Sequence, residues 1–448
     1  MPARVAIIGG GFSGLAAGVA LSEQGHKVIL VERRNHLGGR AYSFIDPKTG
    51  DVVDNGQHLF MGCYHNTISF LKQIGCLDRL KIQESPRVEF LDVDTGRATF
   101  RCPPLPAPLH ALAGLFGLGG LSLGDKFRTL KVGRALKTTN QVASGLTVSE
   151  WLSDLGQSER IKRRFWYPIA IATLNEDPNI GSAEMLRVVL KEAFGGDRSG
   201  TSIAISRVGL SDLYTVGARE FIESRGGDVR TGAPAAQIVI ENGRVVGVRL
   251  KSGETIHADV VISAVPPNAL LDLLPEQLRV GEFARLSSLG SSPIVSINLW
   301  FDRRVTDLEF IGLLGTKIQW LFNKDVIFAS ERQSNQVAIV ISAAREFVDQ
   351  TKEDLVTMAL SELQRLVPDS RAARLVHSVV VKEREATLAH TVESDGLRPA
   401  ARTGVAGLIL AGDWTATGLP ATIESAVISG RTAAGMVDAA GPDTPLRG

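Results

Sequence analysis

The first thirty residues change hydrophobic period in the way that a strand followed by a helix requires. Residues 5–8 are a short apolar run suited to a buried parallel strand. Apolar residues then recur at helical spacing up to the helix stop at Gly25: Leu15, Ala16, Val19 and Ala20. A second apolar run, residues 28–31, ends at an acidic residue. The pattern therefore predicts a strand–helix–strand unit of a parallel sheet.

Two distant stretches continue the same kind of sheet. The middle of the chain predicts a helix and then several short strands: helix 218–225, strands 229–232, 236–240 and 245–250, a hairpin turn at Asn242-Gly243, and a buried strand 258–265. Residues 407–412 form one more apolar run of the parallel type. We therefore expect an α/β fold, with a β-meander inserted in a doubly wound sheet.

A glycine-rich turn joins the first predicted strand to the first helix. Gly9 permits the tight turn, Gly11 lets the backbone approach a pyrophosphate, and Gly14 allows close packing of the helix on the strand. Phe12 and Ser13 lie between them, where the N–H groups and the positive end of the helix face bound phosphates. The turn predicts a dinucleotide site in a Rossmann-like domain.

The end of the second strand favours a long dinucleotide. Glu32 stands where a carboxylate accepts hydrogen bonds from ribose hydroxyl groups. Arg33 follows, and Gly38, Gly39 and Arg40 come soon after, which indicates a further backbone and guanidinium contact to the ligand. The alternative is an ordinary exposed turn with a surface glutamate and a solvated arginine.

Residues near the end of the chain are predicted to complete the same site. Gly412 and Asp413 lie at the carboxyl end of the last predicted strand, where open α/β sheets bind their ligands. The helix that starts near residue 421 points its N-terminus toward this edge, so we expect Thr422 and Ile423 to contact the ligand. Val229 presents its backbone to the adenine, although a plain core position would look the same.

Composition narrows the classes of function. The chain has 448 residues, which is enough for two domains, and its net charge of +1 gives no argument for a nucleic-acid partner. The first strand begins almost at once, which leaves no room for a signal peptide, and three cysteines suit a reducing cytoplasm. Cys63, His65 and Cys76 lack a fourth ligand at a sensible spacing, so we predict no metal site.

Together, these motifs resemble those of the flavin amine oxidase and phytoene desaturase superfamily: Gly9-x-Gly11-x-x-Gly14, Glu32, Leu37-Gly-Gly-Arg40, the Val265-Pro-Pro strand end and Ala411-Gly-Asp413. The resemblance spans nearly the whole chain and implies FAD as the cofactor. It also implies an FAD-binding domain and a discontinuous α+β substrate-binding domain, each built from separate segments: 1–82, 213–267 and 385–448 for the first, 83–212 and 268–384 for the second.

Finer features resemble one group within this superfamily, the squalene-associated desaturase-like hydroxysqualene dehydroxylases. Three stretches carry this likeness: Asp54-Asn-Gly-Gln-His58, Trp166-Tyr-Pro-Ile-Ala-Ile-Ala-Thr-Leu-Asn175 and Gly418-Leu-Pro-Ala-Thr-Ile-Glu424. That group is held to convert hydroxysqualene reductively to squalene with FAD, in hopanoid and squalene biosynthesis. In such a fold the loop that carries Gly56, Gln57 and His58 approaches the flavin ring.

The implied reaction needs a proton for the departing hydroxyl and aromatic faces near a carbocation. We expect the acid to be Asp54, His58 or Glu424, although Glu424 also suits the dipole of the helix that it begins. Trp166 and Tyr167 are the aromatic candidates.

Two other classes of function stay open at this point. A carotenoid or polyene desaturase passes hydride from the substrate to FAD, and a flavin-binding, membrane-associated partner has no turnover at all. An amine oxidase is disfavoured because all four tyrosines precede the second half of the chain, where an aromatic cage is wanted. The sequence shows no second nucleotide motif, so the electron donor for the flavin is unknown.

An uncharged segment is predicted to reach a membrane. Residues 103–124 contain no Asp, Glu, Lys or Arg, but prolines break the start. Only residues 109–123 suit continuous helix, about 22 Å long against a hydrocarbon core of ~30 Å. A basic stripe follows: Lys126, Arg128, Lys131, Arg134 and Lys137. We expect residues 103–137 to dock on anionic lipid and hold a cytoplasmic protein on the inner face of the plasma membrane. The alternative is ordinary core, with Leu112, Phe116 and Leu123 buried.

Overall fold

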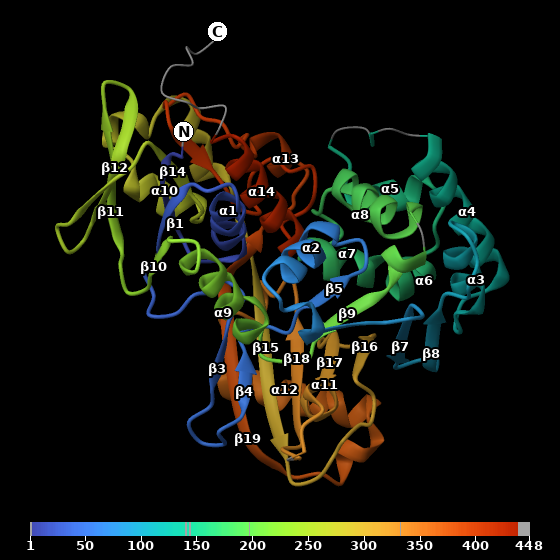
Figure 1. The fold of residues 1–448 in the computed structure, drawn as a ribbon. Coiled ribbons are helices and arrows are strands. Elements are labelled where there is room, and N and C mark those ends of the chain that lie inside the picture. The colour runs from blue at the N-terminus through green and yellow to red at the C-terminus, as the bar shows by residue number, and fades with distance from the viewer. Residues whose placement is uncertain (1, 139–140, 143–144, 197, 332, 438–448) are drawn as a thin grey trace.

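A five-stranded parallel sheet and a seven-stranded mixed sheet organise the chain, with a lobe of helices beside the second sheet (Figure 1). The structure is a computed structural model that describes residues 2–138, 141–142, 145–196, 198–331 and 333–437. Both sheets take strands from distant parts of the chain, so neither forms from one continuous segment.

The parallel sheet gathers three stretches of chain. Its strands lie in the order β10-β2-β1-β14-β20. Their bounds are β1 Arg4–Ile8, β2 Lys27–Val31, β10 Asp228–Arg230, β14 Val260–Ser263 and β20 Leu408–Leu410. In the centre, Val5 pairs with Val28 on one side and with Val260 on the other. The β-branched, apolar strands predicted from the sequence thus occupy the buried sheet that suits them.

Four helices cover one face of this sheet, and a short helix with a small antiparallel sheet covers the other. One core packs the sheet against four helices: α1 Phe12–Glu23, α2 His65–Gln73, α9 Leu210–Glu223 and α14 Ile423–Gly435. A second core packs the other face against α10 Pro267–Leu273 and an antiparallel meander: β11 Ala235–Glu241, β12 Arg244–Leu250 and β13 Thr255–His257. Asn242 and Gly243 make the predicted hairpin turn, with φ of 50° and 75°.

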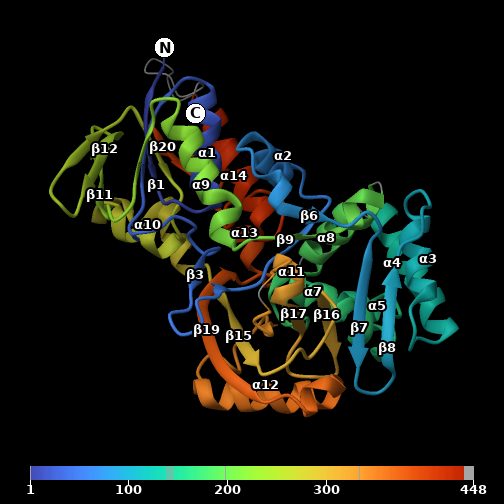
Figure 2. The same ribbon diagram turned by 60° about the horizontal axis from the view of Figure 1, so that its bottom comes forward.

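The seven-stranded sheet is the central sheet of the other part of the molecule. Its order is β19-β15-β18-β17-β16-β7-β8, antiparallel except between β16 and β7. The bounds are β7 Arg87–Asp92, β8 Gly96–Arg101, β15 Ser291–Phe301, β16 Phe310–Leu314, β17 Trp320–Asn323, β18 Gln336–Ile341 and β19 Leu375–Leu388. Helix α12 Lys352–Leu366 covers the outer face (Figure 2).

The remaining elements form the helical lobe and the connections between the sheets. The lobe contains α3 Leu109–Gly117, α4 Leu123–Thr138, α5 Val148–Asp154, α6 Glu159–Ile161, α7 Tyr167–Leu174 and α8 Ala183–Gly195. Connecting elements are β3 Ser43–Ile45, β4 Val52–Asp54, β5 Leu59–Met61, β6 Leu80–Ile82, β9 Ile203–Ser206, α11 Lys324–Phe328 and α13 Ser394–Leu397.

Two expectations about chain organisation need correction. Helix α3 ends at Gly117 and does not continue to residue 123, because the chain turns through a glycine-rich stretch in which Gly120 has φ of 76°. The second substrate segment also begins later than residue 268. Helix α10 and residues Phe283, Leu286 and Leu289 pack in the core of the parallel sheet, and the seven-stranded sheet resumes only at β15.

Candidate cofactor and active site

One large cavity lies where the two halves of the fold meet. It has a volume of about 660 Å³, within the range typical of small-molecule and cofactor sites. Loops at the carboxyl ends of the parallel strands line one part of it: Gly9–Ser13 after β1, Glu32–Arg34 after β2, Ala264–Pro266 after β14 and Gly412–Trp414 after β20. This edge is where ligands bind in open α/β sheets.

The glycines of the first turn fit a nucleotide at this edge. Gly9 has φ of 107°, and a Cβ on Gly14 would lie 1.9 Å from the Gly9 carbonyl oxygen. Gly11 faces Gly39, since a Cβ on Gly11 would lie 3.7 Å from the Gly39 Cα. Two stretches of glycine backbone therefore lie against each other at the cavity wall, and a side chain at Gly39 would meet the Gly11 Cα at 3.1 Å.

The start of α1 is suited to an anion. Its first turn contains no acidic residue, and its leading N–H groups have no partner within the helix. The buried hydroxyl of Ser13 lines the cavity and has no hydrogen-bond partner among the described residues. Phe12 lines the cavity too, with its ring stacked on Tyr214 at 3.6 Å between centroids. These groups would hold a pyrophosphate.

Glu32 and Arg33 border the same cavity. The Glu32 carboxylate is buried and accepts hydrogen bonds from the backbone N–H groups of Gly10 at 2.8 Å and Arg34 at 2.9 Å. It therefore holds the glycine turn against β2, and its remaining lone pairs are those that a ribose would use.

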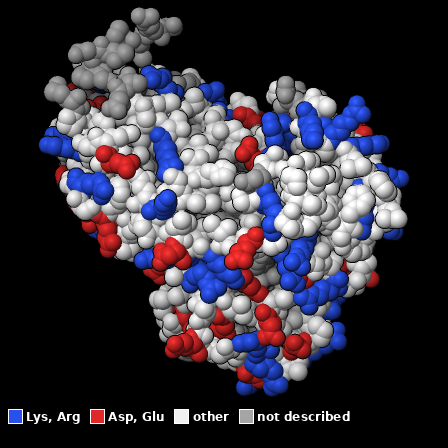
Figure 3. Space-filling view, turned by 45° about the vertical axis from the view of Figure 1, so that its right-hand side comes forward, with Lys and Arg blue, Asp and Glu red and all other residues white. Residues whose placement is uncertain are grey.

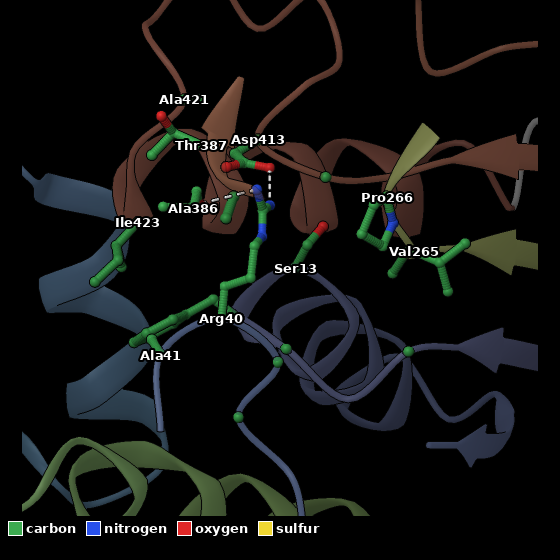
Figure 4. Close-up of a pocket in the computed structure, with 18 of the residues that line it drawn as sticks. Ser13, Arg40, Ala41, Val265, Pro266, Ala386, Thr387, Asp413, Ala421 and Ile423 are labelled. Carbon is green, nitrogen blue, oxygen red and sulfur yellow. Dashed lines mark hydrogen bonds and ion pairs between the residues drawn. The ribbon is translucent and has the colours of Figure 1, made fainter. Parts of the chain in front are cut away.

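Arg40 and Asp413 join the two ends of the site. The Arg40 guanidinium pairs with the Asp413 carboxylate and donates to the Ala386 carbonyl oxygen at 3.3 Å (Figure 4). Arg40 and Asp413 are 373 positions apart in the sequence. Both line the cavity, together with Gly38, Gly39, Gly412, Thr422 and Ile423. The residues that we predicted to contact the two ends of a dinucleotide therefore line the same cavity.

Arg398 supports this loop, and sequence reasoning missed it. Its buried guanidinium donates to the backbone carbonyls of Asp413 at 2.9 Å, Thr415 at 2.6 Å and Leu419 at 2.7 Å. Burial lowers the pKa of Arg398 from its ordinary value. Arg398 therefore fixes the path of the chain from Asp413 toward α14. No local pattern distinguishes such an arginine from a surface one.

His58 lines the cavity as a neutral side chain. Its Nδ1 lies 2.7 Å from the Gly56 carbonyl oxygen, which only accepts, so Nδ1 carries the proton and Nε2 is the acceptor. Burial lowers the pKa of His58 below its ordinary value and outweighs the hydrogen bond to Gly56, which raises it. A neutral imidazole is a poor proton donor, so we revise the expected acid role of His58 to that of an acceptor.

Asp54, one of the residues expected to act as the acid, is not among the residues that line the cavity. Its carboxylate pairs with the buried ammonium of Lys324 at 2.6 Å and accepts from the Leu210 N–H at 3.0 Å. Lys324 also donates to the Gln57 side-chain oxygen at 2.7 Å. Asp54 and Lys324 thus anchor the Gly56–His58 loop that borders the cavity. The isolated position of Lys324 in the sequence gave no sign of this contact.

Glu424 and Val229 also lie outside the cavity lining. The Glu424 carboxylate caps α2, since it accepts from the backbone N–H groups of Asn66 at 2.9 Å and Thr67 at 2.8 Å. These hydrogen bonds stabilise the start of a neighbouring helix. Val229 lines a second pocket, which shares Pro234 with the cavity, and its carbonyl oxygen accepts from Arg219 at 3.0 Å.

The aromatic groups of the cavity differ from those expected. Trp166 is buried in the helical lobe and donates to Gln157, while the Tyr167 hydroxyl bonds to Ser149. The cavity is instead lined by Tyr64, Trp320 and Phe322. Burial raises the pKa of Tyr64, so its phenol keeps its proton.

The second part of the cavity is uncharged. None of the lining residues that come from α7 and its C-cap, β15, β17, β18 or the residue after β18 is ionisable: Ala172, Thr173, Asn175, Ile294, Trp320, Phe322, Val340 and Ser342. Within the described residues no group of His, Cys, Asp and Glu has a metal-binding arrangement. This part of the cavity thus offers no charged side chain to a substrate.

The sequence matches the family described as flavin containing amine oxidoreductase over residues 12–437. The chain belongs to this family. It is 30% identical to hydroxysqualene dehydroxylase of Rhodopseudomonas palustris, over 98% of this chain and 100% of that protein. It is 30% identical to the Sinorhizobium fredii hydroxysqualene dehydroxylase, over 97% and 98%. It is also 26% identical to 15-cis-phytoene desaturase of Synechococcus elongatus, over 96% and 95%.

Solved structures show the same fold. An oxidoreductase from Methanosarcina mazei superposes with a TM-score of 0.77 at 20% identity, covering 96% of this chain and 99% of that one. Putrescine oxidase bound to putrescine superposes with a TM-score of 0.72 at 17% identity, covering 98% and 99%. The protein is an FAD-dependent oxidoreductase, as predicted, and the alternative of a flavin-binding partner without turnover is set aside.

We expect Gly14→Ala to abolish stable FAD binding, because the added Cβ meets the Gly9 carbonyl oxygen at 1.9 Å and must push α1 away from the turn. Flavin content after purification and titration with FAD measure the effect. The control is Gly133→Ala on α4, where a Cβ meets nothing within 4 Å. That change should preserve FAD binding, and a Gly14→Ala protein that binds FAD as tightly as the wild type would contradict the expectation.

The lowered pKa of His58 predicts a pH-dependent stability. In the unfolded chain His58 takes up a proton below about pH 6.5, whereas in the folded protein its lowered pKa keeps it neutral to a lower pH. The contribution of His58 to the free energy of unfolding is therefore complete above about pH 6.5 and declines as the pH falls below that value. Wild-type and His58→Asn holoproteins are compared by urea unfolding between about pH 5 and 8. Their difference in unfolding free energy should change by at most ~1.4 kcal/mol per pH unit below pH 6.5. A constant difference would contradict the assignment.

Proposed function

We propose that the protein reduces hydroxysqualene to squalene, as an FAD-dependent oxidoreductase that acts on a long isoprenoid. The observation that supports this most is the uncharged, aromatic-lined part of the cavity, which continues directly from the cofactor loops. The identity of 30% with two hydroxysqualene dehydroxylases over nearly the full chain supports the same reaction. An amine substrate would favour a carboxylate there, and none of these lining residues carries one.

The reaction breaks a carbon–oxygen bond and forms a carbon–hydrogen bond. Two-electron-reduced FAD, when bound, would supply both the hydride that replaces the hydroxyl and the proton with which the hydroxyl leaves as water, so that the products are the hydrocarbon, water and oxidised FAD. We assign Tyr64 to donate a hydrogen bond to the departing oxygen, and neutral His58 to accept one through Nε2. Trp320 and Phe322 offer ring faces to the positive charge that develops on carbon. An external two-electron donor must then reduce the flavin again.

A desaturase is the second candidate, because phytoene desaturases are similar to this chain over almost its full length. The same cavity would serve it, with hydride passing from the substrate to the oxidised cofactor. The two reactions therefore differ in the redox state of the flavin that each consumes.

We expect hydroxysqualene to oxidise the pre-reduced holoprotein without oxygen, with one squalene formed for each flavin oxidised. Flavin absorbance and mass spectrometry of extracted lipids follow the two products. Squalene is the control substrate, because it lacks the hydroxyl and should leave the reduced flavin unchanged. Reduction of oxidised flavin by phytoene, with no response of reduced flavin to hydroxysqualene, would establish the desaturase instead.

A further inference from the structure

The α3–α4 part of the helical lobe exposes an unusual amount of apolar surface, and it lies at the outer edge of that lobe (Figure 1). Five of the twelve large hydrophobic side chains that are exposed among the described residues fall between positions 105 and 130: Leu105, Leu109, Leu123, Phe127 and Leu130. Single exposed apolar residues are ordinary, but a concentration of them marks an interaction surface.

Helix α4 is turned in the opposite sense to an ordinary surface helix. Its buried side carries Asp125 and Thr129 beside Val132. Its outer side carries Leu123 and Phe127, whose exposures are 69% and 59%. A surface helix normally buries its apolar residues and exposes its polar ones. The outer side of α4 therefore exposes apolar side chains to water.

Hydrogen bonds hold α4 in this orientation. The buried Asp125 carboxylate accepts from the hydroxyls of Ser122 at 2.7 Å and Ser158 at 2.5 Å. Burial tends to raise the pKa of Asp125, but these hydrogen bonds outweigh it and the pKa is lowered. The Thr129 hydroxyl donates to the Lys126 carbonyl oxygen at 2.6 Å. The bond from Ser158, at the start of α6, is the one of these that ties the buried side of α4 to another element, and both buried polar side chains have partners.

The exposed charges carried by this segment itself are of one sign. Asp125 is the only acidic residue between positions 103 and 138, and it is buried, so the exposed charges of this segment are all basic. Lys131, Arg134 and Lys137 continue the outer side of α4 beyond its apolar half. In Figure 3 the lobe at the right shows blue side chains bordering white surface, with little red.

We propose that the outer side of α4, with Leu105 and Leu109 beside it, docks on the surface of an anionic lipid bilayer. The apolar side chains enter the boundary between headgroups and acyl chains, and the basic side chains meet the lipid phosphates. A second copy of the chain is a poorer occupant, because a symmetric interface would bring two basic stripes together. No helix of the described residues is long and apolar enough to cross a bilayer, so α4 lies along the surface.

This inference refines the surface expected from the sequence. Leu118, within the uncharged segment, is buried, and Phe116 packs edge-on against Phe127 at 5.3 Å between ring centroids. Leu118 and Phe116 therefore pack within the lobe, whereas Leu123, Phe127 and Leu130 are exposed on its outer side. The reason for docking rests on the proposed function, since a long isoprenoid partitions into the bilayer. Lipid binding itself is measured without turnover.

Flotation of the holoprotein with vesicles tests the proposal. We expect binding to vesicles of phosphatidylcholine mixed with phosphatidylglycerol, and much weaker binding to phosphatidylcholine alone. Phe127→Asp with Leu130→Asp should lower partitioning at least tenfold. Arg134→Glu with Lys137→Glu should lower it about thirtyfold or more, and raised salt should weaken wild-type binding.

The matched control is Ile45→Asp with Val376→Asp, which changes exposed apolar residues on β3 and β19, outside the lobe. This control should bind as the wild type does. Retained flavin and an unchanged thermal transition show that each variant is folded, since all the substituted side chains are exposed. Equal lipid binding by all variants overturns the proposal. So does a wild type that ignores vesicles but forms a dimer that the Asp variants abolish.

Discussion

The parallel pairing of β1 with β14, and of β14 with β20, is the constraint on which the site depends. These ladders bring residues near positions 9, 264 and 412 to one edge of the sheet, although hundreds of residues separate them along the chain. A parallel strand leaves its carboxyl end at the same edge as its neighbours, so each following loop meets the others there. Together with the loop after β2, these loops line the cofactor part of the cavity at that edge.

Contacts between distant segments then fix the shape of the cavity wall. The Arg40–Asp413 pair spans its cofactor part, and Arg398 holds the loop behind Asp413 by three backbone carbonyls. The buried Asp54–Lys324 pair ties the Gly56–His58 loop to the seven-stranded sheet. A buried ion pair costs desolvation, which these two charges offset through mutual attraction and added hydrogen bonds. Such contacts favour specificity of geometry over stability.

The division of charge within the cavity links structure to chemistry. Ionisable residues gather around the cofactor loops, whereas α7, β15, β17 and β18 contribute uncharged side chains. The charged and the uncharged side chains of the cavity therefore lie in different parts of it. On the molecular surface, the outer side of α4 likewise exposes apolar and basic residues where a surface helix usually exposes a mixture of polar ones.

Local pattern was sufficient for the parallel strands, the Asn242-Gly243 hairpin and the glycine turn, because period and backbone freedom are properties of neighbouring residues. Local pattern predicted a dinucleotide, and the resemblance of the ordered motifs to a known flavoenzyme superfamily implied FAD. It was not sufficient for Asp54 and Glu424, whose environments are set by Lys324 and by the start of α2. The direction of each carboxylate, the neutral state of His58 and the outward turn of α4 depend on packing between distant segments. Only the tertiary structure decides these, because burial and partners have no local signature in the chain.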